Sequence, residues 1–336
     1  MRLSIVVPAY KVENYIEKCI RSLEEQDISK GDYEIIVTND GSPDGCRQIV
    51  EQLQKEFPNI ILINQKNKGV SMARNNAMDV AKGKYIMPID PDDYVLPNTF
   101  SEVLATAESK ELDVLHLGFE IFDTDGNSFW QTNYSKLQGQ IYDGVEGYFH
   151  SHEPSTRDPD RSVAILYRRE MLRQYKINYP KDVPFLEDGL FIGKVCAVAE
   201  KVGFDNRKFY QRTTRLGSAT NSRLFYSDDA IEGFIIAIRD LKSFAVDNLL
   251  NKSQDLLINH VVAKFTLLPV TSVISQKKPF KYIRLIKKLK ENGIKKIEMN
   301  GLRTVFIPLS KMYNFSPLFF FIYYPFYVKY IKKYKY

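Results

Sequence analysis

The sequence predicts an α/β fold in which a mostly parallel sheet is sandwiched by helices, followed by an α-helical C-terminal region. Two observations carry this prediction. Four apolar, β-branched runs of strand length recur in the first ninety residues, at 3–7, 33–37, 60–63 and 85–89. Helical patterns separate these runs, and strands that alternate with helices are typical of βαβ units and of a parallel sheet.

The clearest separating helix follows the first strand. Its apolar residues fall at i, i+3, i+4, i+7, i+8 and i+11, which buries one stripe of a helix; they are Val12, Tyr15, Ile16, Cys19, Ile20 and Leu23. The same kind of pattern recurs between the second and third strands, at Ile49, Val50, Leu53 and Phe57. We therefore expect a helix in each of the first two connections.

Beyond residue 90 the pattern is less regular. Residues 113–119 predict a fifth strand, and 162–167 and 202–204 predict two short ones. Residues 120–160 are polar and lack periodicity, which is typical of a long functional loop. Two helices are expected at 228–246 and 249–265, and a domain boundary near residue 220.

The composition is that of an ordered globular chain. Its 336 residues, 44% hydrophobic and 26% charged, allow one large or two medium domains. The first apolar stretch is too short for a signal-peptide core, so we expect a cytoplasmic protein. The three Cys form no CxxC pair, and the four His lack metal-ligand spacing apart from the loose His150-x-His152. Neither a disulfide framework nor a zinc site is expected.

The net charge of +6 conceals a strong asymmetry. Residues 277–336 hold 15 Lys and Arg against two Glu, a net charge of +13, whereas the other 276 residues hold 32 basic against 39 acidic side chains. An acidic body with a basic tail indicates that the two parts meet different partners, the tail facing an anionic surface.

Polar residues follow each of the first four strands: 8–10, 39–41, 64–69 and 90–93. The carboxyl ends of parallel strands meet at one edge of a sheet, where such folds bind ligands. The densest segment is Asp90-Pro91-Asp92-Asp93, whose three carboxylates repel one another. A divalent metal that carries a phosphorylated ligand would offset this repulsion; the alternative is a solvated acidic turn followed by a helix cap.

The chain lacks both common phosphate-binding glycine signatures, the P-loop and G-x-G-x-x-G after the first strand. This argues against a P-loop ATPase and a Rossmann dehydrogenase. A nucleotide would instead be held by side chains and a metal. Asp40 could accept a hydrogen bond from a base or ribose, and Tyr10 could stack on a base; the alternatives are a turn-forming Asp and a packing Tyr.

Five segments together resemble family 2 glycosyltransferases of the A-type, Rossmann-like fold, the type that assembles bacterial polysaccharides and glycolipids. They are, in chain order, residues 4–10, 39–42, 67–75 (NKGVSMARN), 90–93 (DPDD), and 185–188 (FLED) followed by 210–212 and 217–220. The resemblance covers about residues 1–220. It implies a nucleotide-sugar half at about 1–112, an acceptor half at about 113–220 and a separate C-terminal region at 221–336.

The resemblance implies transfer of a hexosyl or N-acetylhexosaminyl group from a nucleotide-diphosphate sugar, usually a uridine one, to an acceptor hydroxyl with inversion at the anomeric carbon. The residues that it assigns to donor binding are Pro8, Tyr10, Asp40, Arg74, Asp90, Arg212 and Ser218. A divalent cation would stabilise the charge on the leaving diphosphate. Asp92, with Asp90 or Asp93, is the expected metal site, and oxygen ligands favour Mn²⁺ or Mg²⁺ over zinc. Which carboxylates bind the metal stays open.

Asp188 is the general base that the resemblance implies, taking the proton from the acceptor hydroxyl. Glu187 is the alternative base, and a third interpretation is that both carboxylates cap a helix. Arg74 would supply a fixed positive charge beside the pyrophosphate or base, unless it is an ordinary surface arginine. Arg212 and Ser218 would cover the pyrophosphate when the site closes, unless they belong to a basic surface loop.

Two residues qualify the resemblance. Lys11 stands where the family usually has Asn after Pro-x-Tyr, which leaves the details of base contact open. The only Trp, Trp130, could stack on an acceptor sugar, although core packing is the expected role.

The C-terminal tail predicts a membrane-surface segment. Residues 281–290 form an amphipathic basic pattern, and 317–328 are rich in Phe and Tyr. Twelve residues interrupted by Pro325 cannot span a bilayer, which needs about 20, but they could lie in its interface. We expect peripheral association with the inner face of the cell membrane and a glycan or lipid-linked acceptor. Packing as a subdomain is the alternative; nucleic-acid binding is not expected, because no recognised module accompanies the tail.

Two other functions are alternatives to sugar transfer. A sugar nucleotidyltransferase shares a similar sheet and acidic site, but it should carry an early Gly-rich loop with Arg and Lys, which the sequence lacks. A non-catalytic membrane-surface binding protein would not need Asp40, Arg74, Asp92 and Asp188 together.

Overall fold

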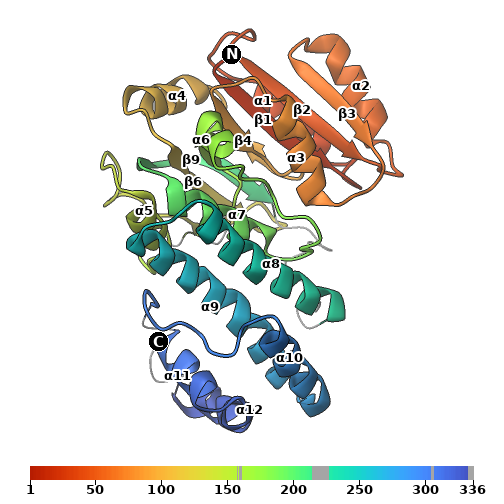
Figure 1. Ribbon diagram of the computed structural model, residues 1–336. Helices are drawn as coiled ribbons and strands as arrows, with labels where there is room; N and C mark the ends of the chain where they lie inside the picture. Colours follow the sequence, from red (N-terminus) through yellow and green to blue (C-terminus); the bar gives the residue numbers. More distant parts are fainter. Residues whose placement is uncertain (157, 159–160, 214–226, 304–305, 332–336) are drawn as a thin grey trace. The chain divides into compact units, whose positions relative to one another are not determined.

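A computed structural model describes residues 1–156, 158, 161–213, 227–303 and 306–331 (Figure 1). The chain divides into two compact units. The sheet unit comprises Met1–Lys181 and Val198–Ser218, and the helical unit comprises Asp182–Ala197 and Ala219–Tyr336. The domain boundary near residue 220 that the sequence pattern predicts stays a prediction.

The sheet unit is built on one mixed sheet in the order β3-β2-β1-β4-β8-β6-β9-β5, with β7 paired to β6. Its strands are β1 (Leu3–Ala9), β2 (Tyr33–Asp40), β3 (Ile60–Gln65), β4 (Tyr85–Pro88), β5 (Tyr94–Val95), β6 (Val114–Phe122), β7 (Ser128–Gln131), β8 (Ile165–Arg168) and β9 (Val202–Thr213). The four predicted strands pair in parallel, as do β6 and β9, whereas β8 is antiparallel to both its neighbours. The predicted α/β fold is confirmed.

Helices flank this sheet, and Figure 1 shows α3 in front of the first strands and α1 behind them. The helices of the unit are α1 (Ile16–Glu24), α2 (Cys46–Glu56), α3 (Val70–Val80), α4 (Phe100–Ser109), α5 (Gly144–Ser151) and α6 (Arg169–Gln174). The predicted stripe of α1 is buried at Ile16, Cys19, Ile20 and Leu23. Both predicted connecting helices are therefore confirmed.

Two expectations for residues 120–160 are wrong. This segment is not one long loop, because it contains β7, which pairs with β6, and the helix α5, which Asp143 caps by accepting the Glu146 N–H. Trp130 does not pack in a core; it lies on β7 and is 38% exposed. A four-residue strand followed by a glycine-containing helix is too short to leave a clear period in the sequence.

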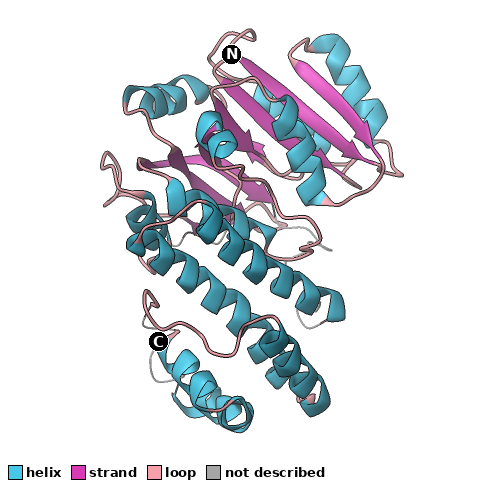
Figure 2. Ribbon diagram, viewed as in Figure 1, coloured by secondary structure: helices cyan, strands magenta, loops and turns pink. Residues whose placement is uncertain are grey.

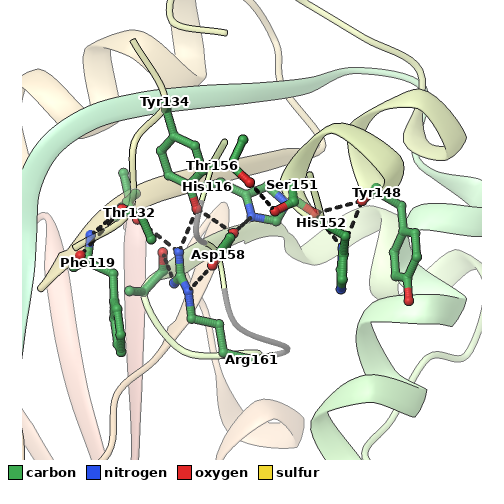
Figure 3. Close-up of polar contacts among 12 residues, drawn as sticks. His116, Phe119, Thr132, Tyr134, Tyr148, Ser151, His152, Thr156, Asp158 and Arg161 are labelled. Carbon is green, nitrogen blue, oxygen red and sulfur yellow. Dashed lines mark hydrogen bonds and ion pairs between the residues drawn. The ribbon is translucent and has the colours of Figure 1, made fainter. Parts of the chain in front are cut away.

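A buried polar network joins β6 to the chain that precedes β8 (Figure 3). Arg161 donates to Asp158 Oδ1 at 2.7 Å, to the Leu117 carbonyl at 3.0 Å and to the Tyr134 hydroxyl at 3.0 Å. Burial opposes ionisation of Asp158, but Arg161 and the hydrogen bonds from its neighbours outweigh it and lower the pKa of that carboxyl. Burial lowers the pKa of His116, whose Nδ1 lies 3.4 Å from Asp158.

The described part of the helical unit contains helices and no strands (Figure 2). They are α7 (Glu187–Val198), α8 (Asp228–Asp247), α9 (Lys252–Ser275), α10 (Pro279–Glu291), α11 (Ile307–Phe315) and α12 (Pro317–Phe326), followed by a π-helical turn (Tyr327–Ile331). A capping box between Asn251 and Gln254 starts α9. The expected helical C-terminal region is confirmed, although α9 extends ten residues past the predicted end at residue 265.

The helix α9 is the core of this unit. Among the described helices only α9 is long and apolar enough to cross a membrane, and 72% of its most apolar part is buried within the fold. Burial of this extent is typical of the central helix of a globular helical unit.

Candidate nucleotide-sugar and metal site

Asp40 ends β2 and organises the loop that leads into α3. Its Oδ1 accepts the Gln65 amide at 2.7 Å and the Lys68 N–H at 2.8 Å, and its Oδ2 accepts the Gly69 N–H at 2.9 Å. Gly41 lies beneath the same loop with a φ of +64°, and a Cβ on it would lie 2.8 Å from the Asn67 nitrogen. The carboxylate of Asp40 therefore fixes a loop, and its contact with a base stays a prediction.

Tyr10 follows β1 and presents its ring to solvent. The side chain is 41% exposed, so the packing interpretation is wrong and the ring is available for stacking. Lys11 next to it has a φ of +54°, donates its backbone N–H to Ser42 Oγ at 2.7 Å and places its ammonium 5.3 Å from the Tyr10 ring centre. Pro8, in contrast, is buried within β1.

Arg74 lies in the second turn of α3 and is only 3% exposed, so it is not a surface arginine. Its Nη2 donates to Asp90 Oδ1 at 2.9 Å, and its guanidinium lies 4.9 Å from the Tyr179 ring centre. Asn75 holds Tyr179 in place through two hydrogen bonds to the Tyr179 backbone, at 2.8 and 2.9 Å. The fixed positive charge that we expected is thus oriented toward the acidic cluster.

The acidic cluster is formed by Asp90, Asp92 and Asp93, which each offer a carboxylate oxygen within 4.8 Å of the others. Asp90 and Asp92 are half-buried, and Asp93 is buried. Burial, and then the charges of Asp90 and Asp92, raise the pKa of Asp93 well above its ordinary value. A divalent cation would offset this repulsion, and three oxygen donors fit Mn²⁺ or Mg²⁺.

The end of β9 holds the cluster in position. The Tyr210 hydroxyl donates to Asp93 Oδ2 at 2.7 Å and accepts the Asp90 N–H at 3.1 Å. Thr213 donates its N–H to Asp93 Oδ1 at 3.0 Å and its hydroxyl to the Asp92 carbonyl at 2.6 Å. Sequence reasoning missed these roles of Tyr210 and Thr213, since both lie about 120 positions from their partners and nothing local marks the pairing.

Glu187 and Asp188 occupy the first turn of α7 and belong to the helical unit. Both are half-buried. Carboxylates in a first turn interact favourably with the helix N-terminus, so the capping and catalytic interpretations both stand as predictions. Arg212 is half-buried in β9, opposite Ile121 of β6, and Ser218 lies outside the described residues.

Comparison with known proteins identifies the family of the chain. Residues 4–175 match the family described as Glycosyl transferase family 2. The uncharacterized glycosyltransferase EpsJ of Bacillus subtilis is 35% identical over 204 residues, which are 60% of this chain and 57% of EpsJ. The poly(ribitol-phosphate) beta-N-acetylglucosaminyltransferase TarS of Staphylococcus aureus is 26% identical over 69% of this chain and 39% of TarS. The chain thus matches less than two thirds of these relatives' own length.

Solved structures share the fold. Residues 1–349 of S. aureus TarS in complex with UDP-GlcNAc superpose with a TM-score of 0.73 at 19% identity, covering 97% of this chain and 92% of that one. The mannosyltransferase PcManGT of Pyrobaculum calidifontis, in complex with GDP-Man and Mn²⁺, superposes with a TM-score of 0.52 at 12% identity, over 95% and 84% of the two chains. The match over residues 4–175, half of the chain, shows that this chain belongs to glycosyltransferase family 2.

Proposed function

We propose that this protein transfers a sugar from a nucleotide-diphosphate sugar, with UDP as the nucleotide, to a hydroxyl of a glycan or lipid-linked saccharide with inversion at the anomeric carbon. The observation that carries the proposal is the cluster of three carboxylates next to the buried Arg74 in a family 2 chain. The TarS complexes with UDP-GlcNAc and UDP support a uridine donor.

Mn²⁺ or Mg²⁺ is the proposed cofactor, held by Asp92 with Asp90 or Asp93; when bound, it would neutralise charge on the diphosphate. The Mn²⁺ complex of PcManGT supports a divalent metal. Both oxygens of Asp93 already accept hydrogen bonds from β9, and Asp90 is paired with Arg74. Asp92 is the first choice as ligand because of its place in the DPDD motif of the family resemblance, and the hydrogen bonds from β9 give Asp93 a second role in orienting the loop.

The protein's own side chains have separate proposed roles in donor binding. Asp40 holds the loop before α3 so that its backbone faces the nucleotide, and the exposed ring of Tyr10 stacks on the base. Arg74 balances the pyrophosphate charge with a guanidinium that Asp90 and Tyr179 orient. Pro8, Arg212 and Ser218 complete the donor contacts that the family resemblance implies.

Asp188 is the proposed general base, with Glu187 as the alternative. A carboxylate removes the proton from the acceptor hydroxyl as that oxygen attacks the anomeric carbon and the nucleotide diphosphate leaves from the opposite face. Two adjacent residues in one helical turn point in different directions, so one of the two would face the acceptor. The substitution of each in turn separates them.

The experiment that tests this function is a transfer assay with UDP-sugars that measures UDP release in the presence of Mn²⁺. We expect Asp92→Ala and Asp188→Asn each to reduce the rate by at least about a hundredfold, the scale of a lost acid–base or electrostatic contribution. Asp79→Asn is the matched control, an exposed carboxylate on the surface of α3. Full activity in both site variants would refute the proposed mechanism.

We propose further that the protein works at the cytoplasmic face of the cell membrane. The support is the charge of the tail, +13 over residues 277–336, because an anionic leaflet attracts each nearby basic residue by about 1 kcal/mol. Relatives named for a poly(ribitol-phosphate) substrate act on a polymer acceptor, and an acceptor polymer or lipid held at the membrane would suit this location.

A further inference from the structure

The helix α12 carries an exposed apolar stripe along its full length. Leu318 is 68% exposed and Ile322, one turn later, is 69% exposed. Phe319 and Phe326 lie on the same side by helical spacing and are also exposed, and Phe315 at the end of α11 contacts Phe319 with ring centres 5.5 Å apart. Contiguous exposure of large apolar side chains marks an interaction surface.

The opposite face of α12 is anchored, so the stripe belongs to a fixed helix. Phe320 is fully buried and meets the ring of Tyr313 in α11 edge-on. The Tyr282 hydroxyl of α10 donates to the Pro317 carbonyl at 2.5 Å, and its ring centre lies 4.8 Å from that of Phe321. One face of α12 therefore packs against α10 and α11, and the opposite face is exposed.

The charged residues that flank the stripe in the sequence are all basic. No Asp or Glu follows Glu298, whereas Lys311 precedes the stripe and Lys329, Lys332, Lys333 and Lys335 follow it in the sequence. Phe and Tyr make up most of α12, and aromatic side chains with adjacent lysines suit the headgroup region of a bilayer.

We propose that α12 is an interfacial membrane anchor: the stripe formed by Phe315, Leu318, Phe319, Ile322 and Phe326 inserts into the acyl–headgroup boundary of an anionic leaflet, with its axis in the membrane plane. The ten residues of α12 cannot span the bilayer, but they suffice to bury one apolar face. The inference rests on the proposed membrane association and adds the surface that makes it.

A second copy of the chain is a poorer occupant of this stripe. A two-fold interface brings the same patch of both copies together, which would oppose lysines of one copy to lysines of the other without an acidic side chain after Glu298 to compensate. An anionic leaflet supplies both the apolar layer and the opposite charge.

The test measures binding of the full chain to vesicles of phosphatidylcholine with phosphatidylglycerol, and to vesicles of phosphatidylcholine alone. We expect binding to the anionic vesicles only, and we expect Leu318→Ser with Ile322→Ser to weaken it at least about tenfold. The matched control is Val246→Ser with Leu249→Ser, which removes two side chains of the same unit that are 73% and 89% exposed. The control is expected to bind like the wild type.

A fluorescent residue gives a second readout. In a Trp130→Phe background, which removes the only Trp, Ile322→Trp should shift its emission to the blue on addition of anionic vesicles, and Val246→Trp should not. The anchor proposal is overturned if the Leu318→Ser, Ile322→Ser variant binds anionic vesicles as the wild type does, or if the emission of Ile322→Trp does not shift. Membrane association through the basic charge would remain in either case. No binding by the wild type refutes membrane association itself. If the wild type and the Val246→Ser, Leu249→Ser control form concentration-dependent dimers and the Leu318→Ser, Ile322→Ser variant does not, the stripe would be assigned to a second copy of the chain.

Discussion

The Tyr210 hydroxyl bridges the two ends of the acidic cluster, donating to the Asp93 carboxylate at 2.7 Å and accepting the Asp90 N–H at 3.1 Å. A strand more than a hundred residues away thus holds the segment proposed to bind metal. Burial and the nearby charges of Asp93 and Asp90 raise the pKa of Tyr210 well above its ordinary value, so the hydroxyl remains a donor.

Tyr210→Phe removes the hydroxyl, so the Asp93 carboxylate loses a donor and the Asp90 N–H loses its acceptor. We expect affinity for Mn²⁺ and UDP to fall about tenfold, since one unsatisfied buried partner costs about 1–3 kcal/mol. Titration calorimetry measures the affinity. Tyr85→Phe is the control, because its hydroxyl is also buried and donates to the Ala107 carbonyl at 2.9 Å, away from the cluster. If Tyr85→Phe loses as much affinity for Mn²⁺ and UDP as Tyr210→Phe does, the loss would reflect a general effect on stability.

Arg74→Lys keeps the positive charge but loses the planar fork that contacts Asp90 and stacks on Tyr179. We expect UDP affinity to fall by about tenfold to a hundredfold, because a lost hydrogen bond between charged groups costs about 1.5–3 kcal/mol. Arg47→Lys, at the exposed Arg47–Glu51 pair of α2, provides the comparison. If Arg74→Lys binds UDP as tightly as Arg47→Lys does, the fork has no part in donor binding.

The attachment of α7 to the helical unit predicts a separation of binding from turnover. Lys194 of α7 donates to Asp240 of α8 at 2.6 Å, and a Cβ on Gly193 would lie 3.2 Å from the Val261 side chain of α9. Gly193→Val would therefore push α7 away from α9. If Asp188 is the base, kcat should fall at least about tenfold with unchanged UDP affinity, since a shift of about 1 Å can cost that much.

The control for Gly193→Val is Gly31→Val, because a Cβ at Gly31 would meet only the Ser29 hydroxyl, at 3.6 Å. Circular dichroism and thermal unfolding check that both variants fold. Loss of UDP affinity in parallel with kcat would show that the substitution acts through general unfolding, and unchanged kcat would remove α7 from the mechanism.

The buried His116 predicts a pH dependence of stability. Burial lowers the pKa of His116 in the folded state. Below the ordinary His pKa of 6.5, the unfolded chain therefore binds a proton at this residue that the folded chain does not bind. Stability should therefore fall as the pH drops through 6.5. The groups around the ring are Asp158, Arg161 and His152, with Tyr134 in edge contact.

Urea unfolding between pH 5 and pH 8 measures this effect. His116→Gln should be less stable at pH 8 yet lose less stability on acidification than the wild type. His150→Gln, which replaces a half-buried ring, is the control. An unchanged slope in His116→Gln would show that another group titrates.

The sequence predicts the first half of the fold well because each βαβ unit is local. The runs that became β1 to β4 and the stripe of α1 are visible without knowledge of the rest of the chain. The polar ends of those strands indicate an edge where a ligand binds, and they include Asp40 and the acidic cluster, whereas Arg74 is indicated only by the family resemblance. Contacts between residues far apart in the chain could not be predicted. The pairing of Tyr210 with Asp93 and the contact of Tyr179 with Arg74 form only when the sheet assembles.

Burial of single side chains was harder to predict. Residue type predicts a core position for Trp130, but the residue lies on the exposed strand β7 at an edge of the sheet. The exposed stripe of α12 also has no separate signature, because a run of Phe, Leu and Ile looks alike whether a core or a lipid surface covers it.

The most direct test of the acidic cluster is calorimetric titration of UDP into the wild type, Asp92→Asn and Asp79→Asn, each with Mn²⁺ and again with EDTA. The account predicts that wild type and Asp79→Asn bind UDP in Mn²⁺ and lose at least about tenfold in affinity with EDTA, while Asp92→Asn binds weakly in both. Equal UDP affinity in all three proteins, with or without Mn²⁺, would contradict it.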